Sequence, residues 1–255
     1  MSKLFPQMYD SPENSQAVGG LSYCSVAFVV LPFTLSLFFF DRTTAPIYPL
    51  VEAFYQIANF GCLVFIYRSY LADSWINVSI APKQVISIFL SAVAMLAAVY
   101  AVLAYAGIYG TSESSWIAFL GVLPMTGIEM MMLPSQFALE GGILAVLVLV
   151  FLGPITTACL YYATAFAPLC SAGHRFAAYL AVAGITAVPR LITYFTIWGG
   201  WKELPLYLAQ LPIHLIACWT YQKANTIWAP VFTHAIANIL CIVGLFLLRF
   251  AGYIG

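Results

Sequence analysis

Long apolar stretches alternate with short polar ones along almost the whole chain. The pattern predicts eight membrane-spanning helices, at residues 21–40, 46–67, 84–107, 116–133, 142–166, 176–198, 204–221 and 227–249. Each is close to the ~20 apolar residues that a helix needs to cross the hydrocarbon core. Helices are expected because backbone groups in lipid must be satisfied within their own segment. The fourth and seventh stretches are also compatible with re-entrant or interfacial segments.

Polar segments set the expected boundaries. Residues 68–82 are predicted to form a polar loop between the second and third spans, and Gly153-Pro154 is predicted to kink the fifth span. The first apolar run passes into Asp41 without a small-residue cleavage site, which favours a span over a secretory leader. We therefore expect a polar N-terminal segment, 1–20, followed by a single transmembrane domain, 21–255.

Composition agrees with a membrane protein. The chain has 255 residues, of which 63% are hydrophobic and 7% charged, and a mean hydropathy of +0.96. Soluble domains average roughly 25% charged residues, and so few charges do not cover a water-exposed surface. The fold class expected is an all-α, polytopic transmembrane helix bundle of about eight spans.

Charge and cysteine content exclude several functions. The formal net charge is +0, and the basic residues are scattered singly, so we expect no nucleic-acid partner. With the N-terminus inside, five basic residues fall on the inner side and three on the outer side, which favours that orientation slightly. The inner five are Lys3, Arg68, Lys83, Lys202 and Arg249, and the outer three are Arg42, Arg175 and Lys223. The six cysteines show no C-x-x-C spacing, and most fall in apolar runs, where free cysteine serves packing.

Ionisable residues inside predicted spans are the candidates for function, because each costs about 2.5–3.5 kcal/mol at mid-membrane. His234 and Asn238 are spaced i,i+4, which places them on one helix face. Together they can donate hydrogen bonds to a polarised carbonyl oxygen, as in an oxyanion hole. The alternative is a polar pair that bonds neighbouring helices.

Four further residues carry open alternatives. His214 is a partner for Glu129, a proton carrier or a satisfied residue of the bundle. Arg190 binds a substrate or the carbonyls freed at Pro189. Glu129 and Glu52 are candidates for a general base, or each lies near an interface with its carboxylate in water.

In the C-terminal third, a tyrosine, a short polar turn and an apolar-Pro step at 221–230 precede H-x-x-x-N at His234 and Asn238. This order resembles the last motif of the CAAX-protease and bacteriocin-processing (CPBP or Abi) family of membrane proteases. The resemblance covers about residues 142–250. Arg175 follows 167–170 as the arginine of the first motif does.

The resemblance implies an intramembrane endopeptidase of a prokaryotic plasma membrane, with a peptide or membrane-protein substrate. It assigns His234 and Asn238 to the oxyanion hole. The chain departs from the family twice, with Cys170-Ser171 where the family has two glutamates and Gly199 where its second motif has histidine. Glu129, Glu140 and His174 are candidates to replace the missing water-activating acid.

Three functions therefore stay open: an endopeptidase, a non-catalytic relative that acts as a binding or immunity protein, and a small transporter component. An acid close to His234 favours the first, and an apolar lining the second. A polar cavity joining Arg190 and His214 favours the third. No cofactor is expected, since the histidines lack a ligand-pair spacing; zinc held by His174, His214 and His234 is the alternative.

Overall fold

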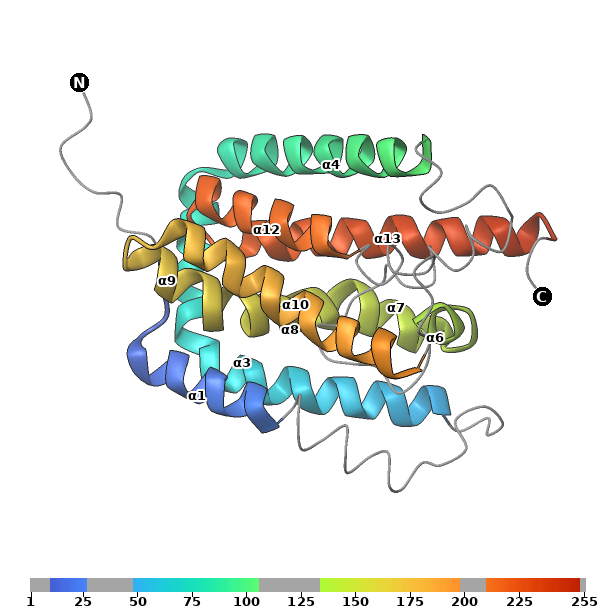
Figure 1. Ribbon diagram of the computed structural model, residues 1–255, viewed down its shortest axis with the longest axis horizontal. Coiled ribbons are helices and arrows are strands. Elements are labelled where there is room, and N and C mark those ends of the chain that lie inside the picture. Colours follow the sequence, from blue (N-terminus) through green and yellow to red (C-terminus); the bar gives the residue numbers. More distant parts are fainter. Residues whose placement is uncertain (1–9, 27–47, 106–133, 198–209, 253–255) are drawn as a thin grey trace.

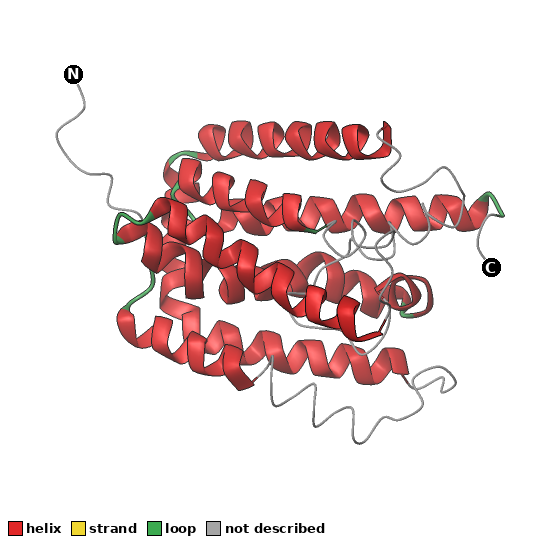
Figure 2. Ribbon diagram, in the orientation of Figure 1, coloured by secondary structure: helices red, strands yellow, loops and turns green. Residues whose placement is uncertain are grey.

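The computed structural model describes residues 10–26, 48–105, 134–197 and 210–252, and all regular structure in these ranges is helical (Figure 2). The all-α class is confirmed for this part of the chain. The elements, in chain order, are α1 (Asn14–Ser25), α3 (Tyr48–Ile80), α4 (Pro82–Tyr105), α6 (Pro134–Glu140), α7 (Gly142–Val146), η2 (Leu147–Leu152), α8 (Gly153–Thr157), η3 (Ala158–Phe166), α9 (Ala167–Ser171), α10 (Arg175–Ile197), α12 (Leu211–Ala224) and α13 (Trp228–Phe250).

Four of the described helices are long and apolar enough to cross a membrane: Pro49–Ile80, Pro82–Val99, Gly142–Ser171 and Trp228–Leu247. They correspond to the second, third, fifth and eighth predicted spans. Four spans are fewer than the eight predicted, and the difference has several sources.

The sixth and seventh predicted spans are only partly supported by the described residues. In α10 the apolar stretch extends over Arg175–Val188. The 14 residues of α12 are about 21 Å long, which is less than the hydrocarbon core. The predicted span 116–133, and most of 21–40, lie outside the described residues.

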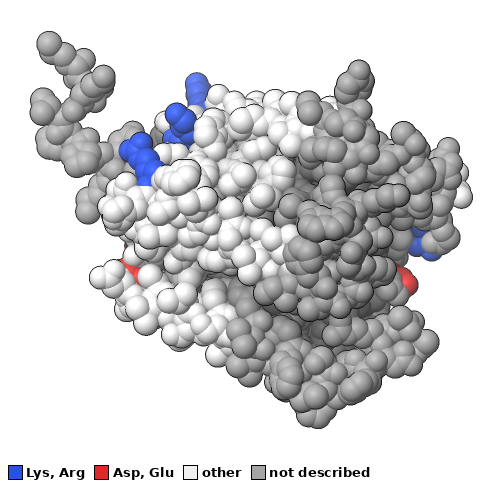
Figure 3. All heavy atoms as spheres, in the orientation of Figure 1, with Lys and Arg blue, Asp and Glu red and all other residues white. Residues whose placement is uncertain are grey.

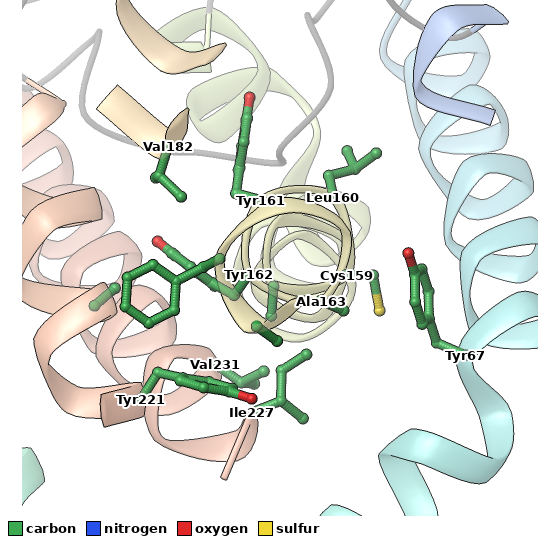
Figure 4. Close-up of a cluster of buried hydrophobic side chains, with 14 of the residues drawn as sticks. Tyr67, Cys159, Leu160, Tyr161, Tyr162, Ala163, Val182, Tyr221, Ile227 and Val231 are labelled. Carbon is green, nitrogen blue, oxygen red and sulfur yellow. The ribbon is translucent and has the colours of Figure 1, made fainter. Parts of the chain in front are cut away.

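The long helices lie side by side in one elongated bundle (Figure 1). The continuous helical stretch Gly142–Ser171 runs through its middle and packs against α13, α10, α3 and α1. Figure 4 looks along this stretch and shows buried side chains radiating from it towards Tyr67 of α3 and Tyr221 of α12. Lipid tails are as apolar as the side chains, so removing apolar side chains from lipid does not by itself stabilise the bundle. Close packing between the helices stabilises it instead.

Two prolines shape the central helix. A proline lacks the N–H of the helical ladder, and its ring collides with the carbonyl four residues earlier. Pro154 is the second residue after the π-helical turns of η2, and Pro168 is the second residue after those of η3. The wider turns remove the collision, and Thr164 Oγ1 donates to the carbonyl of Cys159, five residues earlier, at 2.8 Å. The kink expected at Pro154 is thus accommodated by widened turns.

The predicted loop at 68–82 is wrong: α3 stays helical to Ile80, and the chain turns at Ala81. Tertiary contacts explain why polar residues are accepted in these turns. Ser74 Oγ lies 3.0 Å from Thr226 Oγ1, and Asn77 Nδ2 donates to the carbonyl of Asn225 at 3.0 Å. The polar groups therefore face the turn between α12 and α13 and not open solvent.

The arrangement of the described helices also changes the predicted distribution of charges, because α4 ends and α6 begins at the same end of the bundle (Figure 1). The sequence placed Lys83 on the side opposite Arg175 and Lys223. In the structure the turns at 81, 172–174 and 225–227 lie at the same end of the bundle (Figure 1), so these three cations share one end. Arg249, which was expected beside Lys83, follows at the far end of α13.

Candidate functional site

A cluster of three hydrogen-bonded rings lies in the middle of the bundle. The Tyr162 hydroxyl lies 2.5 Å from His234 Nε2 and 3.0 Å from His214 Nδ1. The imidazole of His234 stacks on the Tyr162 ring, with centroids 5.7 Å apart. Tyr162 and His234 are completely buried, and His214 is 2% exposed. We call these residues the His-Tyr-His cluster.

Three elements bring the cluster together. Tyr162 is on η3, where the π-helical turns shift the direction in which successive side chains point. His214 is on α12 and His234 on α13. Asn225, in the left-handed conformation with φ 50°, ends α12 and reverses the chain. The two helices therefore pack side by side as an antiparallel pair, and their imidazole centroids are 5.1 Å apart.

The number of donors and acceptors limits which groups of the cluster can donate hydrogen bonds to which others. A neutral imidazole has one donor and one acceptor, and a phenol has one donor. Tyr162 therefore donates to one histidine and accepts from the other. His234 Nδ1 is buried and has no hydrogen-bond partner among the described residues, so one hydrogen-bonding position of the cluster stays open within this part of the chain.

Asn238 lies one turn after His234 and is also completely buried. Its Nδ2 donates to the carbonyl of Leu149, on η2, at 2.6 Å. The predicted pair thus shares one buried face of α13, and each member bonds to the central helix. Both groups that the resemblance assigns to an oxyanion hole are directed at oxygens of the protein itself.

The other predicted site residues lie elsewhere. His174 and Arg175 are exposed at the turn between α9 and α10, at the end of the bundle and not in its middle. Glu140 is exposed at the end of α6. Glu129 and the side chain of Arg190 lie outside the described residues.

Of the two proposed family acid positions, one is buried and one is exposed. Cys170 is 1% exposed, whereas the Ser171 hydroxyl donates to the carbonyl of Pro168 at 2.9 Å. Both are in α9, next to the turn that carries His174. The structure therefore does not bring this position to the His-Tyr-His cluster.

A second buried polar group is formed on α3. Glu52 is completely buried, and its Oε1 accepts a 2.8 Å hydrogen bond from Gln56 Nε2. One turn further, Asn59 accepts a hydrogen bond from the Tyr23 hydroxyl of α1. Of the two candidate acids that the structure describes, Glu52 is the buried one and Glu140 the exposed one. The neighbour of Glu52, Ala53, packs in the same apolar cluster as Leu149.

A metal site finds no support in the described ranges. Those residues contain no group of three or more His, Cys, Asp or Glu side chains that could hold an ion. The three histidines proposed as alternative zinc ligands are not gathered, because His174 is exposed at the end of the bundle. The two described surface hollows also lie away from the cluster, along α4 and between α1 and α3.

Tyr162 is the residue of the cluster that the sequence did not single out. It is the second of two tyrosines in an apolar run, and only the π-helical turns direct it towards the histidines. His214 was singled out, but with Glu129 as its suggested partner. Comparison with protein-family models, curated proteins and solved structures finds no match for this chain.

Proposed function

We propose that the protein is a multi-pass membrane protein of the CAAX-protease-like type that binds a membrane peptide or protein without hydrolysing it. The observation that carries the proposal is the engagement of His234 and Asn238 with the protein's own oxygens, the Tyr162 hydroxyl and the Leu149 carbonyl. The proposal rests on this geometry together with the sequence resemblance.

An oxyanion hole works when its donors point at the place where the substrate oxygen becomes charged. In this chain His234 Nε2 and Asn238 Nδ2 already bond to oxygens of the protein itself. A substrate carbonyl at these two nitrogens competes with a 2.5 Å and a 2.6 Å hydrogen bond. Inside a dry bundle each broken bond leaves an unpaired polar group, which costs about 1–3 kcal/mol.

Peptide hydrolysis also needs a base within hydrogen-bond reach of the attacking water. Cys170 and Ser171 supply no carboxylate where the family has its glutamates. Among the described acids, Glu52 is bonded to Gln56 and Glu140 is exposed at the end of α6. This distribution supports a binding role over a hydrolytic one.

An endopeptidase is the second candidate, and the open Nδ1 of His234 favours it. A buried imidazole nitrogen without a partner keeps the capacity to bond a substrate carbonyl or a water. The two candidates differ in one measurable property, which is whether a bound peptide is cut.

The test uses the purified full-length protein in nanodiscs with a library of synthetic membrane-spanning peptides. A photo-crosslinking residue replaces Phe151, which is 58% exposed on the central helix. We expect a subset of peptides to crosslink and to be recovered intact by mass spectrometry. Cleavage products that vanish in His234→Ala, but persist in the control Tyr179→Phe, would establish the endopeptidase. If no peptide crosslinks, the binding role is refuted.

A further inference from the structure

The last turns of α3 have more length than a membrane span requires. The 33 residues of α3 are about 50 Å long, against a hydrocarbon core of about 30 Å. Figure 1 shows where the excess goes: the chain bends across the end of the bundle before it turns into α4. A helix in this position lies along the membrane surface if the bundle spans the bilayer.

Hydrogen bonds to α1 and to the α12–α13 hairpin hold the start of this crossing segment, and those of Ser74 and Asn77 hold its later turns. On the α1 side, Gln16 Nε2 donates to Ser69 Oγ at 2.7 Å. On the α12 side, the Tyr70 and Tyr221 hydroxyls are 2.9 Å apart, and Trp228 Nε1 donates to the carbonyl of Leu71 at 2.9 Å. The segment is therefore fixed against the bundle, and its outer face is defined.

That outer face has large exposed apolar side chains, with Asp73 and Ser79 exposed beside them. Trp75, Ile76 and Ile80 are 46%, 54% and 76% exposed, whereas Tyr70 and Ser74 on the inner face are buried. The Trp75 ring also packs edge-on against Trp228, with centroids 5.0 Å apart. A fixed helix with an exposed apolar face suits the boundary between headgroups and acyl chains, where tryptophan is enriched.

Cations surround the same end. Lys83, Arg175 and Lys223 are exposed there, and Figure 3 shows Lys and Arg gathered at this end of the visible face. Glu13 and Asp73 are exposed at this end as well, but acidic residues contribute little to membrane orientation. The opposite end has Arg249 among the described residues.

We propose that this end, which we call the anchoring end (residues 69–83, 172–175 and 222–228), docks on anionic phospholipid headgroups of the cytoplasmic leaflet. The outer face of the crossing segment enters the interface, and the lysines contact the phosphates. The positive-inside rule places this end, and with it the N-terminal segment from Asp10, in the cytoplasm. The occupant is lipid because exposed apolar side chains and exposed cations occur together at this end, the combination that binds an anionic membrane surface.

The lipid test compares Lys83→Gln/Lys223→Gln with wild type and with Arg249→Gln as the matched control at the other end. Nanodiscs contain phosphatidylcholine with phosphatidylglycerol, and native mass spectrometry measures which lipid the released protein retains. Each basic residue near an anionic surface strengthens attraction about fivefold, so the double variant should lose about 25-fold of the preference for phosphatidylglycerol. Retained preference, or an equal loss in Arg249→Gln, would overturn the proposal.

Orientation is tested in intact cells with a membrane-impermeant maleimide, against the wild-type background of native cysteines. Ser171→Cys lies at the anchoring end and Ala251→Cys at the other, and both positions are exposed. We expect labelling of Ala251→Cys alone before the cells are opened, and of both afterwards. Labelling of Ser171→Cys from outside places the anchoring end in the wrong compartment and refutes the assignment.

Discussion

Replacing Tyr162 with phenylalanine removes one oxygen from the centre of the His-Tyr-His cluster. The ring that stacks on His234 is kept, so packing changes little. Two hydrogen bonds are lost, one to each imidazole. Side-chain hydrogen bonds in membrane proteins are worth about 0.6 kcal/mol on average and at most about 1.7. Tyr162→Phe should therefore lower the free energy of unfolding by about 1–3 kcal/mol.

Unfolding in mixed micelles at increasing denaturing detergent measures this loss. Tyr179→Phe is the control, because its hydroxyl bonds Gln222 at 3.1 Å in a partly buried position where water can replace it, and we expect a loss below about 0.5 kcal/mol. A double variant with His214→Phe should cost less than the sum of the two single variants, because they share one bond. Tyr162→Phe at the level of the control, or strict additivity, would refute the network.

Two further perturbations test the packing at α1 and the N-terminal segment. In Gly20→Ala the new Cβ collides with the Tyr67 hydroxyl and approaches Thr164 Oγ1 to 2.9 Å, so unfolding should be easier by about 1–3 kcal/mol. Gly19→Ala, which meets nothing closer than 3.5 Å, should be neutral, and equal effects would contradict the close approach. Burial raises the pKa of Asp10 above its usual 3.8, and a hydrogen bond from Ser74 opposes the shift. A raised native pKa means stability that is lost as pH rises above about 4, so Asp10→Asn should remove this loss from the unfolding curve, and an unchanged pH profile would contradict it.

The third and eighth spans are the ones whose ends the sequence predicted best. The third and eighth spans differ from α4 and α13 by at most two residues at either end, because nothing but lipid-compatible side chains is needed to specify them. The prediction of a loop at 68–82 was wrong because it assumed that polar residues in this segment are exposed to water. Ser74 and Asn77 are polar, but their partners lie about 150 residues away in the chain, and no local pattern contains that pairing.

The same distinction holds at the site. The i,i+4 spacing of His234 and Asn238 placed both on one helix face, and both are buried there. What each bonds to was not predictable. Tyr162 reaches His234 because η3 is π-helical, and Leu149 offers its carbonyl to Asn238 from the same widened helix. Prolines in the sequence predict where the backbone hydrogen-bond pattern of the helix is interrupted. The side-chain hydrogen bonds that form there depend on which helix packs alongside.

Hydropathy indicates the bilayer as the surroundings of this chain, and the need to hydrogen-bond the backbone within each segment predicts helices. A period of 3.6 residues predicts which side chains share a helix face. Three facts required the packed structure: three cations share one end, α3 continues across that end, and His234 bonds a tyrosine and not an acid. Those facts depend on contacts between residues far apart in the chain. Such contacts form only where the shapes and the hydrogen-bonding groups of several packed helices fit one another, and no local stretch of sequence contains that information.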